Sequence, residues 1–402
     1  MKKISFSPPD ISELEIQNVA EVLRSGWITT GPKTKELERR LAEYVGANKT
    51  VCLNSATAAL EMALRVLGIG PGDEVITCAY TYTASASVIE HVGAKIVLVD
   101  CQADCVHIDY EALERAITEK TKAIIPVDLA GIPCDYDRIF SIIESKKELF
   151  TPSENKYQKA IGRIVVLADA AHAIGASYKG KMIGTAADFT AFSFHAVKNF
   201  TTAEGGALTW NSIPGIDDNE TYDILQHLSL HGQSKDAISK ENFGSWEYDI
   251  IGTWYKCNMT DIMAGIGLAQ LERYEGMLER RKACIEKYDA ALKPLGVQTL
   301  EHFNKDYTSN GHLYITRIPG ISDEQRREII IKMAEAGITT NVHYKPLPMM
   351  TAYKNLGFDI ADYPNARAFY ENEITLPLYS KLTEEDVDYI IDNYTAIIKE
   401  YL

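Results

Sequence analysis

Two hydrophobic patterns alternate along the first 210 residues, and this alternation constrains the fold more than any other feature. Segments with apolar residues at helical spacing, such as ISELEIQNVAEVLRSG and TAALEMALRVLG, are followed by β-branched runs such as EVITCAY, KIVLVD, KAIIPVDLAG and RIVVLADAAH. Helix and strand in turn are typical of βα units, and strongly apolar strands indicate a mostly parallel sheet covered on both faces. The sequence therefore predicts an α/β domain.

After about residue 255 the pattern changes to that of a smaller α+β unit. A chain of 402 residues is too long for a single compact core, so we predict a large domain over 1–254 and a small domain over 255–402. We expect the segment 148–162 to be a polar surface loop. In the small domain we expect a long amphipathic helix, a strand, a helix, a strand and a final helix, at 260–296, 311–318, 322–337, 338–344 and 382–402 respectively.

Composition and charge limit the partners. Hydrophobic residues make up 46% and charged residues 24%, which is ordinary for a globular protein, but the net charge is −15. An acidic chain repels nucleic acid and anionic membranes, so we expect neither as a partner. The N-terminal MKKISFSPPD does not resemble a signal peptide, and no apolar run is long enough to span a membrane.

The seven cysteines are scattered without a disulfide-like framework, which favours a reducing, cytoplasmic setting. Cys101 and Cys105 lack a histidine pair at metal-ligand spacing, so we interpret both as structural and expect no metal. The glycines of GIGPGDEVI, at 68–76, follow a predicted helix and precede a predicted strand. A dinucleotide-binding fingerprint needs the opposite order, so these glycines indicate a helix end and a tight turn.

One lysine, Lys198, lies in FSFHAVKNFTTAEGG where a buried strand gives way to a Gly-rich turn, and Asp169 closes the apolar run RIVVLADAAH. Open parallel sheets bind ligands at the carboxyl ends of their strands, where both residues fall. Pyridoxal phosphate requires such a pair: the lysine forms an imine with the aldehyde, and the carboxylate keeps the pyridine nitrogen protonated. Burial or a neighbouring cation should lower the pKa of the lysine. A chance pair or an ordinary ion pair is the alternative.

Two further segments fit this hypothesis. LNSATAAL opens a predicted helix after a strand, so the N–H groups of Thr57 and Ala58 could hold a phosphate; a simple N-cap by Ser55 or Thr57 is the alternative. CAYTYTASA ends a strand with aromatic residues, of which Tyr82 could stack on a planar ring. Ordinary core or interface packing of Tyr82 is equally compatible with the sequence.

The motifs SGWITTGP, NSATAAL, ADAAHAIGASYKGK, FSFHAVKN, YKCNMTDIMAGIGLAQLER, GITTNVHY and LPLYSKLTEEDV occur in this order along the chain. Together they resemble the DegT/DnrJ/StrS-type sugar aminotransferases over nearly the whole chain, with the closest likeness to the branch that makes UDP-4-amino-4-deoxy-L-arabinose. The resemblance implies the aspartate aminotransferase-like fold (fold type I), with a large α/β domain and a smaller C-terminal α+β domain.

The resemblance also implies roles for matched residues. Lys198 would carry the cofactor and move protons, Asp169 would pair with the pyridinium, and His172 would bond the cofactor's phenolic oxygen or pack beside the ring. The remaining cofactor contacts implied in this way are ring stacking by Tyr82 and phosphate binding by Thr57, Ala58 and Ser193.

Substrate contacts are implied from two other segments. His343, in NVHY, matches a residue near the sugar and nucleotide, and the GWITTGP loop, which contains Thr29, would line this subunit's cleft or its partner's. The loop before the long helix departs from the family pattern, because Trp254 replaces a glycine. Lys256 lies there where a phosphate-contacting group is expected.

The implied reaction is a two-stage transamination in a cytoplasmic homodimer with sites at the interface. L-Glutamate would give its amino group to the cofactor, leaving 2-oxoglutarate, and a nucleotide-linked keto sugar would accept it; a UDP-4-keto pentose or 6-deoxyhexose is the first choice. The alternatives are a non-catalytic, cofactor-binding sensor, a sugar dehydratase and a nicotinamide oxidoreductase. Lys198 argues against a dehydratase, in which histidine replaces the lysine, and the glycine order argues against an oxidoreductase.

Overall fold

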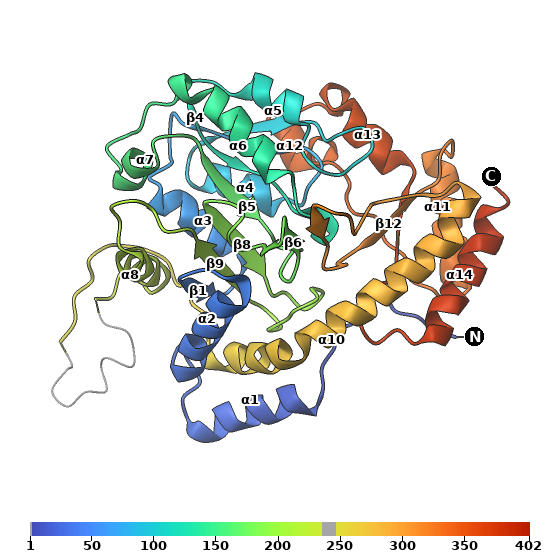
Figure 1. Ribbon diagram of the computed structural model, residues 1–402, viewed down its shortest axis with the longest axis horizontal. Coiled ribbons are helices and arrows are strands. Elements are labelled where there is room, and N and C mark those ends of the chain that lie inside the picture. The colour runs from blue at the N-terminus through green and yellow to red at the C-terminus, as the bar shows by residue number, and fades with distance from the viewer. Residues whose placement is uncertain (1, 235–246) are drawn as a thin grey trace.

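The computed structural model describes residues 2–234 and 247–402. A seven-stranded sheet, ordered β1-β9-β8-β5-β4-β2-β3, forms the centre of the molecule (Figure 1). All its strands run parallel except β9, which pairs antiparallel with both β1 and β8. The mostly parallel sheet predicted from the sequence is therefore confirmed. Its strands are β1 Thr50–Leu53, β2 Glu74–Cys78, β3 Lys95–Val99, β4 Thr121–Ile125, β5 Val165–Asp169, β8 Phe189–Ser193 and β9 Gly206–Trp210.

Helices pack around this sheet, as the alternating pattern predicts. Local signals fix their ends: Ser12 and Glu15 form a capping box at the start of α1, and Gly26, at φ 77°, ends it. The long helix α10 packs against α1 and α2 and then runs toward the C-terminal elements (Figure 1). The helices up to this point are α1 Glu13–Ser25, α2 Pro32–Val45, α3 Ala56–Val66, α4 Ala84–His91, α5 Tyr110–Ala116, α6 Tyr136–Ser145, α7 Lys156–Ile161, α8 Asp218–Ser229 and α10 Asp261–Leu292.

The C-terminal part has its own sheet and its own core. Its sheet, β10-β12-β13, is antiparallel, and α11, α14 and the second half of α10 pack on it around a separate cluster of buried residues. Ile4, near the N-terminus, joins this second cluster, whereas Tyr353 and Phe369 join the first. The boundary at 254/255 stays a prediction. The elements are β10 Gln298–Thr299, β12 Tyr314–Arg317, α11 Asp323–Glu335, α12 Thr351–Asn355, α13 Pro364–Glu371, β13 Glu373–Leu376 and α14 Glu384–Ile398.

Two local predictions are wrong. The segment 148–162 is not simply a polar loop, because it contains α7, whose Tyr157 and Gln158 are buried; the Gln158 amide donates to the Leu67 carbonyl at 2.8 Å. The segment 338–344 is not a strand and makes only isolated bridges. There the N–H of His343 donates to the Glu373 carboxylate at 3.0 Å, so this N–H bonds a side chain instead of the backbone carbonyl of a neighbouring strand.

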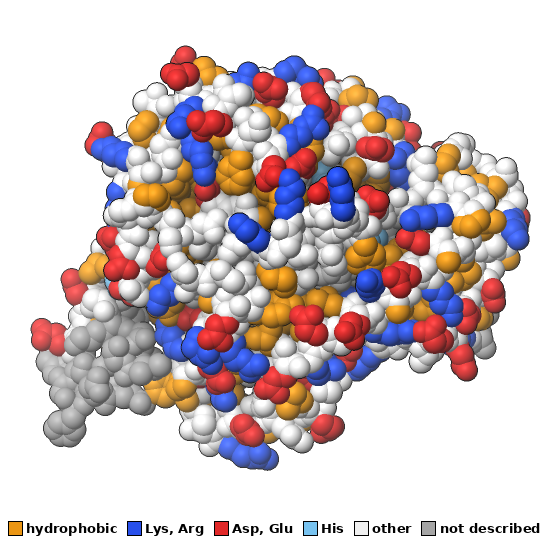
Figure 2. Space-filling model, viewed as in Figure 1, with side chains coloured by type: hydrophobic (Ala, Val, Ile, Leu, Met, Phe, Trp, Pro, Cys, Tyr) orange, Lys and Arg blue, Asp and Glu red, His pale blue; other side chains and the backbone are white. Residues whose placement is uncertain are grey.

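Other features follow the sequence more closely. α3 ends at Val66, Gly68 takes φ 64° in the turn, and β2 begins at Glu74, as expected for a helix end and turn. A small sheet, β11-β6-β7, joins Tyr307–Thr308 to Ser177–Tyr178 and Lys181–Met182. Over the described residues, no helix is both long and apolar enough to cross a membrane. Lys and Arg side chains lie interspersed with Asp and Glu over the face shown in Figure 2.

Candidate active site

A cavity of about 360 Å³ lies at the carboxyl ends of the central strands. Asp169 is the last residue of β5, and Lys198 follows β8 by a short turn in which its N–H donates to the His195 carbonyl at 2.9 Å. Both side chains line the cavity, so the structure brings together the pair on which the cofactor hypothesis depends. Of the other residues predicted from the sequence, the same cavity is lined by Thr57, Tyr82, His172 and Ser193.

Lys198 is unusual for a lysine because its side chain is half-buried and lines the cavity. Burial lowers the pKa of Lys198 to about 8, and the negative charge of Asp169 acts in the opposite direction. The shift that we expected from the sequence is therefore present. An amine with such a pKa is neutral in about a tenth of the molecules at pH 7 and in about half of them at pH 8. Only the neutral form attacks a carbonyl carbon.

Asp169 is held in place by neutral donors. Its Oδ2 accepts a hydrogen bond from the Ser85 hydroxyl at 2.7 Å, and its Oδ1 accepts one from the Ala171 N–H at 3.2 Å. Burial raises the pKa of this carboxyl group, while these hydrogen bonds and the Lys198 charge lower it. A buried carboxylate without a close cation is stabilised by a ligand that brings a positive N–H group to it, as a pyridinium does.

His172 has a defined tautomer. The N–H of Ala130 donates to its Nδ1 at 3.2 Å, so Nδ1 has no proton and Nε2 carries it. Nε2 lies 3.2 Å from the Tyr344 hydroxyl. Burial and the charge of Lys198 hold the pKa of His172 far below its ordinary value, so the ring is a neutral donor.

The N-terminus of α3 lies very close to the start of β9. A Cβ on Gly206 would lie 2.4 Å from the Ser55 carbonyl carbon, so only glycine allows this approach. Ser55 caps α3 by accepting from the Ala58 N–H at 3.1 Å, which is the N-cap alternative stated above. Thr57 and Ser193 line the cavity beside this helix end, whereas Ala58 is not among its lining residues.

Two aromatic side chains border the opening. Tyr82 is 61% exposed, and its ring centroid lies 5.8 Å from that of Tyr344, with the rings tilted by 46°.

His343 directly precedes Tyr344 in the chain. Its ring stacks on Phe6 at 5.4 Å, and its Nδ1 lies 3.0 Å from the Thr375 hydroxyl. Burial and the Lys198 charge lower the pKa of His343 to about 3, and His343 does not line the cavity.

Thr29 and Lys256 are not among the residues that line this cavity. Thr29 is exposed, and its carbonyl accepts from the Asp261 N–H at 3.1 Å at the start of α10. Lys256 is also exposed and hydrogen-bonds the Asn258 side chain. This segment lies next to the N-terminus of α3, because the Asn54 N–H donates to the Cys257 carbonyl at 2.8 Å.

Sequence reasoning missed Tyr344 and Ser85. Tyr344 lines the cavity, and its hydroxyl lies 3.2 Å from Nε2 of His172. Its position directly after His343 in NVHY could have pointed to it. Ser85 bonds Asp169 from a different βα unit, 84 positions away in the chain. No local pattern distinguishes such a serine from an ordinary one in the first turn of a helix.

The fold and this site together define a pyridoxal phosphate-dependent aminotransferase of the aspartate aminotransferase-like type. The chain belongs to the DegT/DnrJ/EryC1/StrS aminotransferase family, whose model matches residues 9–395. Within that family it is a sugar aminotransferase that uses pyridoxal phosphate.

Three relatives illustrate this membership. Spr1654 from Streptococcus pneumoniae, whose assignment as a sugar aminotransferase is provisional, is 60% identical in its pyridoxal phosphate form, with a TM-score of 0.96 and full coverage of both chains. PseC from Helicobacter pylori, an aminotransferase involved in the biosynthesis of pseudoaminic acid, is 28% identical over 99% of this chain and 100% of its own, with a TM-score of 0.86. The spore coat polysaccharide biosynthesis protein SpsC from Bacillus subtilis is 39% identical over 98% of this chain and 97% of its own.

Proposed function

We propose that this enzyme moves an amino group from L-glutamate to the keto group of a nucleotide-linked sugar. The observation that carries the proposal is the Lys198 amine, which shares a cavity with the buried Asp169 carboxylate and has its pKa lowered to about 8 by burial. When bound, pyridoxal phosphate supplies an electron-withdrawing ring that makes the proton on an amine-bearing carbon easier to remove.

Each residue of the site has a task in this scheme. Lys198 would hold the cofactor and, once released by an incoming amine, take up and return the substrate proton as general base and acid. Asp169 would accept a hydrogen bond from the ring nitrogen and favour its protonated form. His172 would donate its Nε2 proton to an oxygen on the ring, while Tyr82 packs on the ring. Phosphate binding falls to Thr57, Ser193 and the α3 N-terminus, with Ala58 and Lys256 as further proposed contacts.

The sugar substrate is proposed to lie beyond the ring, near His343 and Thr29. The family membership and the polysaccharide-related name of SpsC support a sugar acceptor. A UDP-4-keto pentose or UDP-4-keto-6-deoxyhexose is our first choice.

We also propose that the enzyme acts as a homodimer in the cytoplasm. Large apolar side chains are exposed in the single chain: Tyr82, which lines the cavity, at 61%, and Ile251 and Trp254, in the segment before α10, at 50% and 38%. A partner subunit that covers these residues would remove apolar surface from water and exclude solvent from the site. All seven cysteines are free, which supports a reducing compartment.

A half-reaction tests the proposal. The yellow holoenzyme should lose its visible band when L-glutamate is added, with one equivalent of 2-oxoglutarate formed. The resulting amine form should then convert one member of a panel of nucleotide keto sugars to an amino sugar, detected as a mass change.

Two lysine variants control this experiment. Lys198→Ala should abolish the bleaching, because Lys198 is the one lysine among the described residues that line the cavity. Lys120→Ala changes an exposed lysine that does not line the cavity, so it should leave the bleaching unchanged. Failure of every amino acid to bleach the band would overturn the proposal in favour of a cofactor-binding sensor.

A further inference from the structure

His343 is held by contacts from three parts of the chain. Its N–H donates to the Glu373 carboxyl group at 3.0 Å, and its carbonyl accepts from the Tyr80 hydroxyl at 2.8 Å. Its ring stacks on Phe6 at 5.4 Å, and Nδ1 lies 3.0 Å from the Thr375 hydroxyl. In the part of the chain that the structure describes, Nε2 is the one polar atom of His343 without a hydrogen-bond partner. The orientation of His343 is therefore fixed, and Nε2 is the atom left to meet a ligand.

His343 lies beside the candidate active site. Its ring packs edge-on against that of Tyr344, with 4.9 Å between the centroids, and Tyr344 lines the active-site cavity. The sugar substrate is proposed above to lie near His343, and the inference drawn below rests on that proposed function.

Two buried polar side chains on β13 stand behind His343. Glu373 and Thr375 are two positions apart in the strand, so they point to the same face of the sheet, and both are fully buried. Oγ1 of Thr375 lies 2.5 Å from Oε1 of Glu373 and 3.0 Å from Nδ1 of His343. The three side chains form a continuous chain of hydrogen bonds, Glu373–Thr375–His343, which we call the relay.

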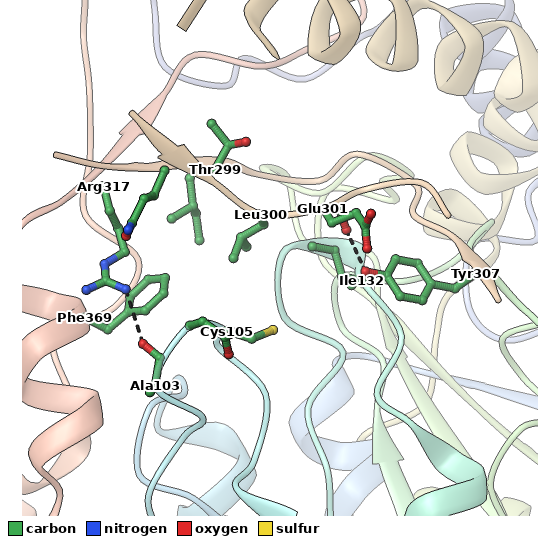
Figure 3. Close-up of a pocket in the computed structure, with 12 residues that line it drawn as sticks. Ala103, Cys105, Ile132, Thr299, Leu300, Glu301, Tyr307, Arg317 and Phe369 are labelled. Carbon is green, nitrogen blue, oxygen red and sulfur yellow. Dashed lines mark hydrogen bonds between the residues drawn. The ribbon is translucent and has the colours of Figure 1, made fainter. Parts of the chain in front are cut away.

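Glu373 has no ion-pair partner among the residues that the structure describes. Arg317 lies opposite Glu373 on β12, but its guanidinium donates to the Ala103 carbonyl at 3.4 Å (Figure 3). Arg326, on α11, pairs with Asp323 instead. Because a buried carboxylate without a close cation is costly, the protonated form of Glu373 is favoured.

The pKa of Glu373 agrees with this argument. Burial raises that pKa to about 8, although the hydrogen bonds from Thr375 and from the His343 N–H, and the charge of Arg326, act in the opposite direction. At pH 7 about nine tenths of the molecules would therefore carry a proton on Glu373, and at pH 9 about a tenth would.

The other titratable groups that face Glu373 stay neutral. Tyr80 and Tyr344 contact His343, and Tyr394 lies on α14; burial raises the pKa of all three phenols, and the charge of Glu373 raises each further. Burial lowers the pKa of His343 to about 3, so its ring is neutral near pH 7. A neutral histidine ring has one N–H and one bare nitrogen, and its hydrogen bonds decide which is which.

We propose that Glu373 and Thr375 are positioning residues that hold the proton of His343 on Nε2, from which it is donated in a hydrogen bond to an oxygen of the sugar substrate. Protonated Glu373 donates from Oε1 to the Thr375 hydroxyl, since Oε2 already accepts from the His343 N–H. Thr375 then donates its own O–H to Nδ1, which leaves the ring proton on Nε2. When Glu373 loses its proton, Thr375 donates to the carboxylate, Nδ1 carries the ring proton, and Nε2 becomes an acceptor.

Nitrogen-15 NMR of the substrate-free holoenzyme tests the position of this proton. With ring-labelled histidine, the His343 signals are assigned by their loss in His343→Gln. At pH 7 they should be those of a neutral ring with its proton on Nε2, and between pH 7 and 9 the proton should move to Nδ1. A proton on Nδ1 at pH 7 would overturn the proposal. This measurement needs no sugar, so its result does not depend on the proposed acceptor.

Glu373→Gln tests the first link of the relay. A glutamine amide is close in shape to a protonated carboxyl group, and it donates an N–H to Thr375 at every pH. The Nε2 proton of His343 should therefore stay in place up to pH 9. A proton that still moves to Nδ1 in this variant would show that another group controls His343, and the proposal would fail.

Thr375→Val tests the second link. Without the hydroxyl, the position of the His343 proton should no longer follow the charge of Glu373, and Thr375→Ser should restore the dependence. Thr316→Val is the matched control, because Thr316 is equally buried on β12 but its hydroxyl donates to the Ile374 carbonyl at 2.7 Å. This control should show the pH dependence of the wild type.

Transamination measures what the proton contributes to sugar binding. With a UDP-4-keto-6-deoxyhexose as acceptor, the KM of the wild type should rise several-fold between pH 7 and 9. Lys198 also titrates near pH 8, so the informative quantity is the difference from Glu373→Gln, in which the rise should be smaller. Equal rises in the two proteins, or an equal difference in the KM for L-glutamate, would overturn the proposal. A holoenzyme that bleaches with L-glutamate but converts no keto sugar would instead contradict the proposed acceptor, and the NMR result would still decide the relay.

Discussion

Burial and the charge of Asp169 act in opposite directions on the pKa of Lys198. Burial lowers the pKa of the amine to about 8, and the carboxylate charge raises it, so removing that charge should lower the pKa further. We predict that in the cofactor-free enzyme Lys198 reacts with acetic anhydride at a rate that rises with pH and levels off above about 8. In Asp169→Asn the midpoint should move to lower pH. Mass spectrometry of the labelled peptide measures both profiles.

Ser85→Ala is the matched control for this titration. It removes a hydrogen bond to Asp169 but keeps the carboxylate in place, so the Lys198 midpoint should stay near that of the wild type. An unchanged midpoint in Asp169→Asn would show that the two groups do not interact across the cavity.

At the scale of the element, the close approach of β9 to α3 depends on Gly206, which has no side chain. A Cβ on Gly206 would meet the backbone of Ser55 at 2.4 Å, and backbone atoms in a strand and a helix cannot give way easily. We predict that Gly206→Ala destabilises the protein by about 1–3 kcal/mol and weakens cofactor binding, since the proposed phosphate site lies at this end of α3. Chemical denaturation and cofactor titration measure the two effects.

Gly276→Ala is the control: it is the same kind of substitution, but it should have the opposite effect on stability. Gly276 is exposed on α10, and a Cβ there would meet nothing within 4 Å. Because alanine is the better helix former, this variant should be stabilised by about 0.5–1 kcal/mol. Equal effects of the two substitutions would contradict the steric argument for Gly206.

The start of α2 depends on a residue of another helix. The Asp261 carboxylate, buried at the start of α10, accepts hydrogen bonds from the N–H groups of Gly31 at 2.8 Å and Thr34 at 2.9 Å. Asparagine loses the charge and one acceptor, so Asp261→Asn should cost about 2–3 kcal/mol of unfolding free energy. Asp217→Asn is the control, since Asp217 is an exposed N-cap of α8 and asparagine caps equally well. A similar small loss in both variants would contradict the prediction.

These elements show where sequence reasoning succeeds and where it stops. Local periodicity and caps predict α1, α3, α10 and the parallel strands, and strand-end position places Lys198 and Asp169 at one edge of the sheet. The contact of Asp261 with Gly31 spans 230 positions, so no local sequence pattern predicts it. The same holds for the contact of Ser85 with Asp169. The segment 338–344 has the composition of a strand, but a side-chain hydrogen bond from the His343 N–H to Glu373 replaces its ladder.

At the scale of the whole molecule, the proposed dimer can be tested through its exposed apolar residues. We predict that light scattering gives twice the mass of the chain, and that Ile251→Asp combined with Trp254→Asp gives a monomer. Both side chains are partly exposed in the single chain, at 50% and 38%, so the change should not disturb the core but should place charges in an apolar interface. Ile331→Asp, which changes a similarly exposed residue of α11, should leave the dimer intact.

If the partner covers the site, the monomer should also release its cofactor more readily, seen as faster loss of the visible band on dialysis. A double variant that remains dimeric with its cofactor bound would place the interface elsewhere on the molecule.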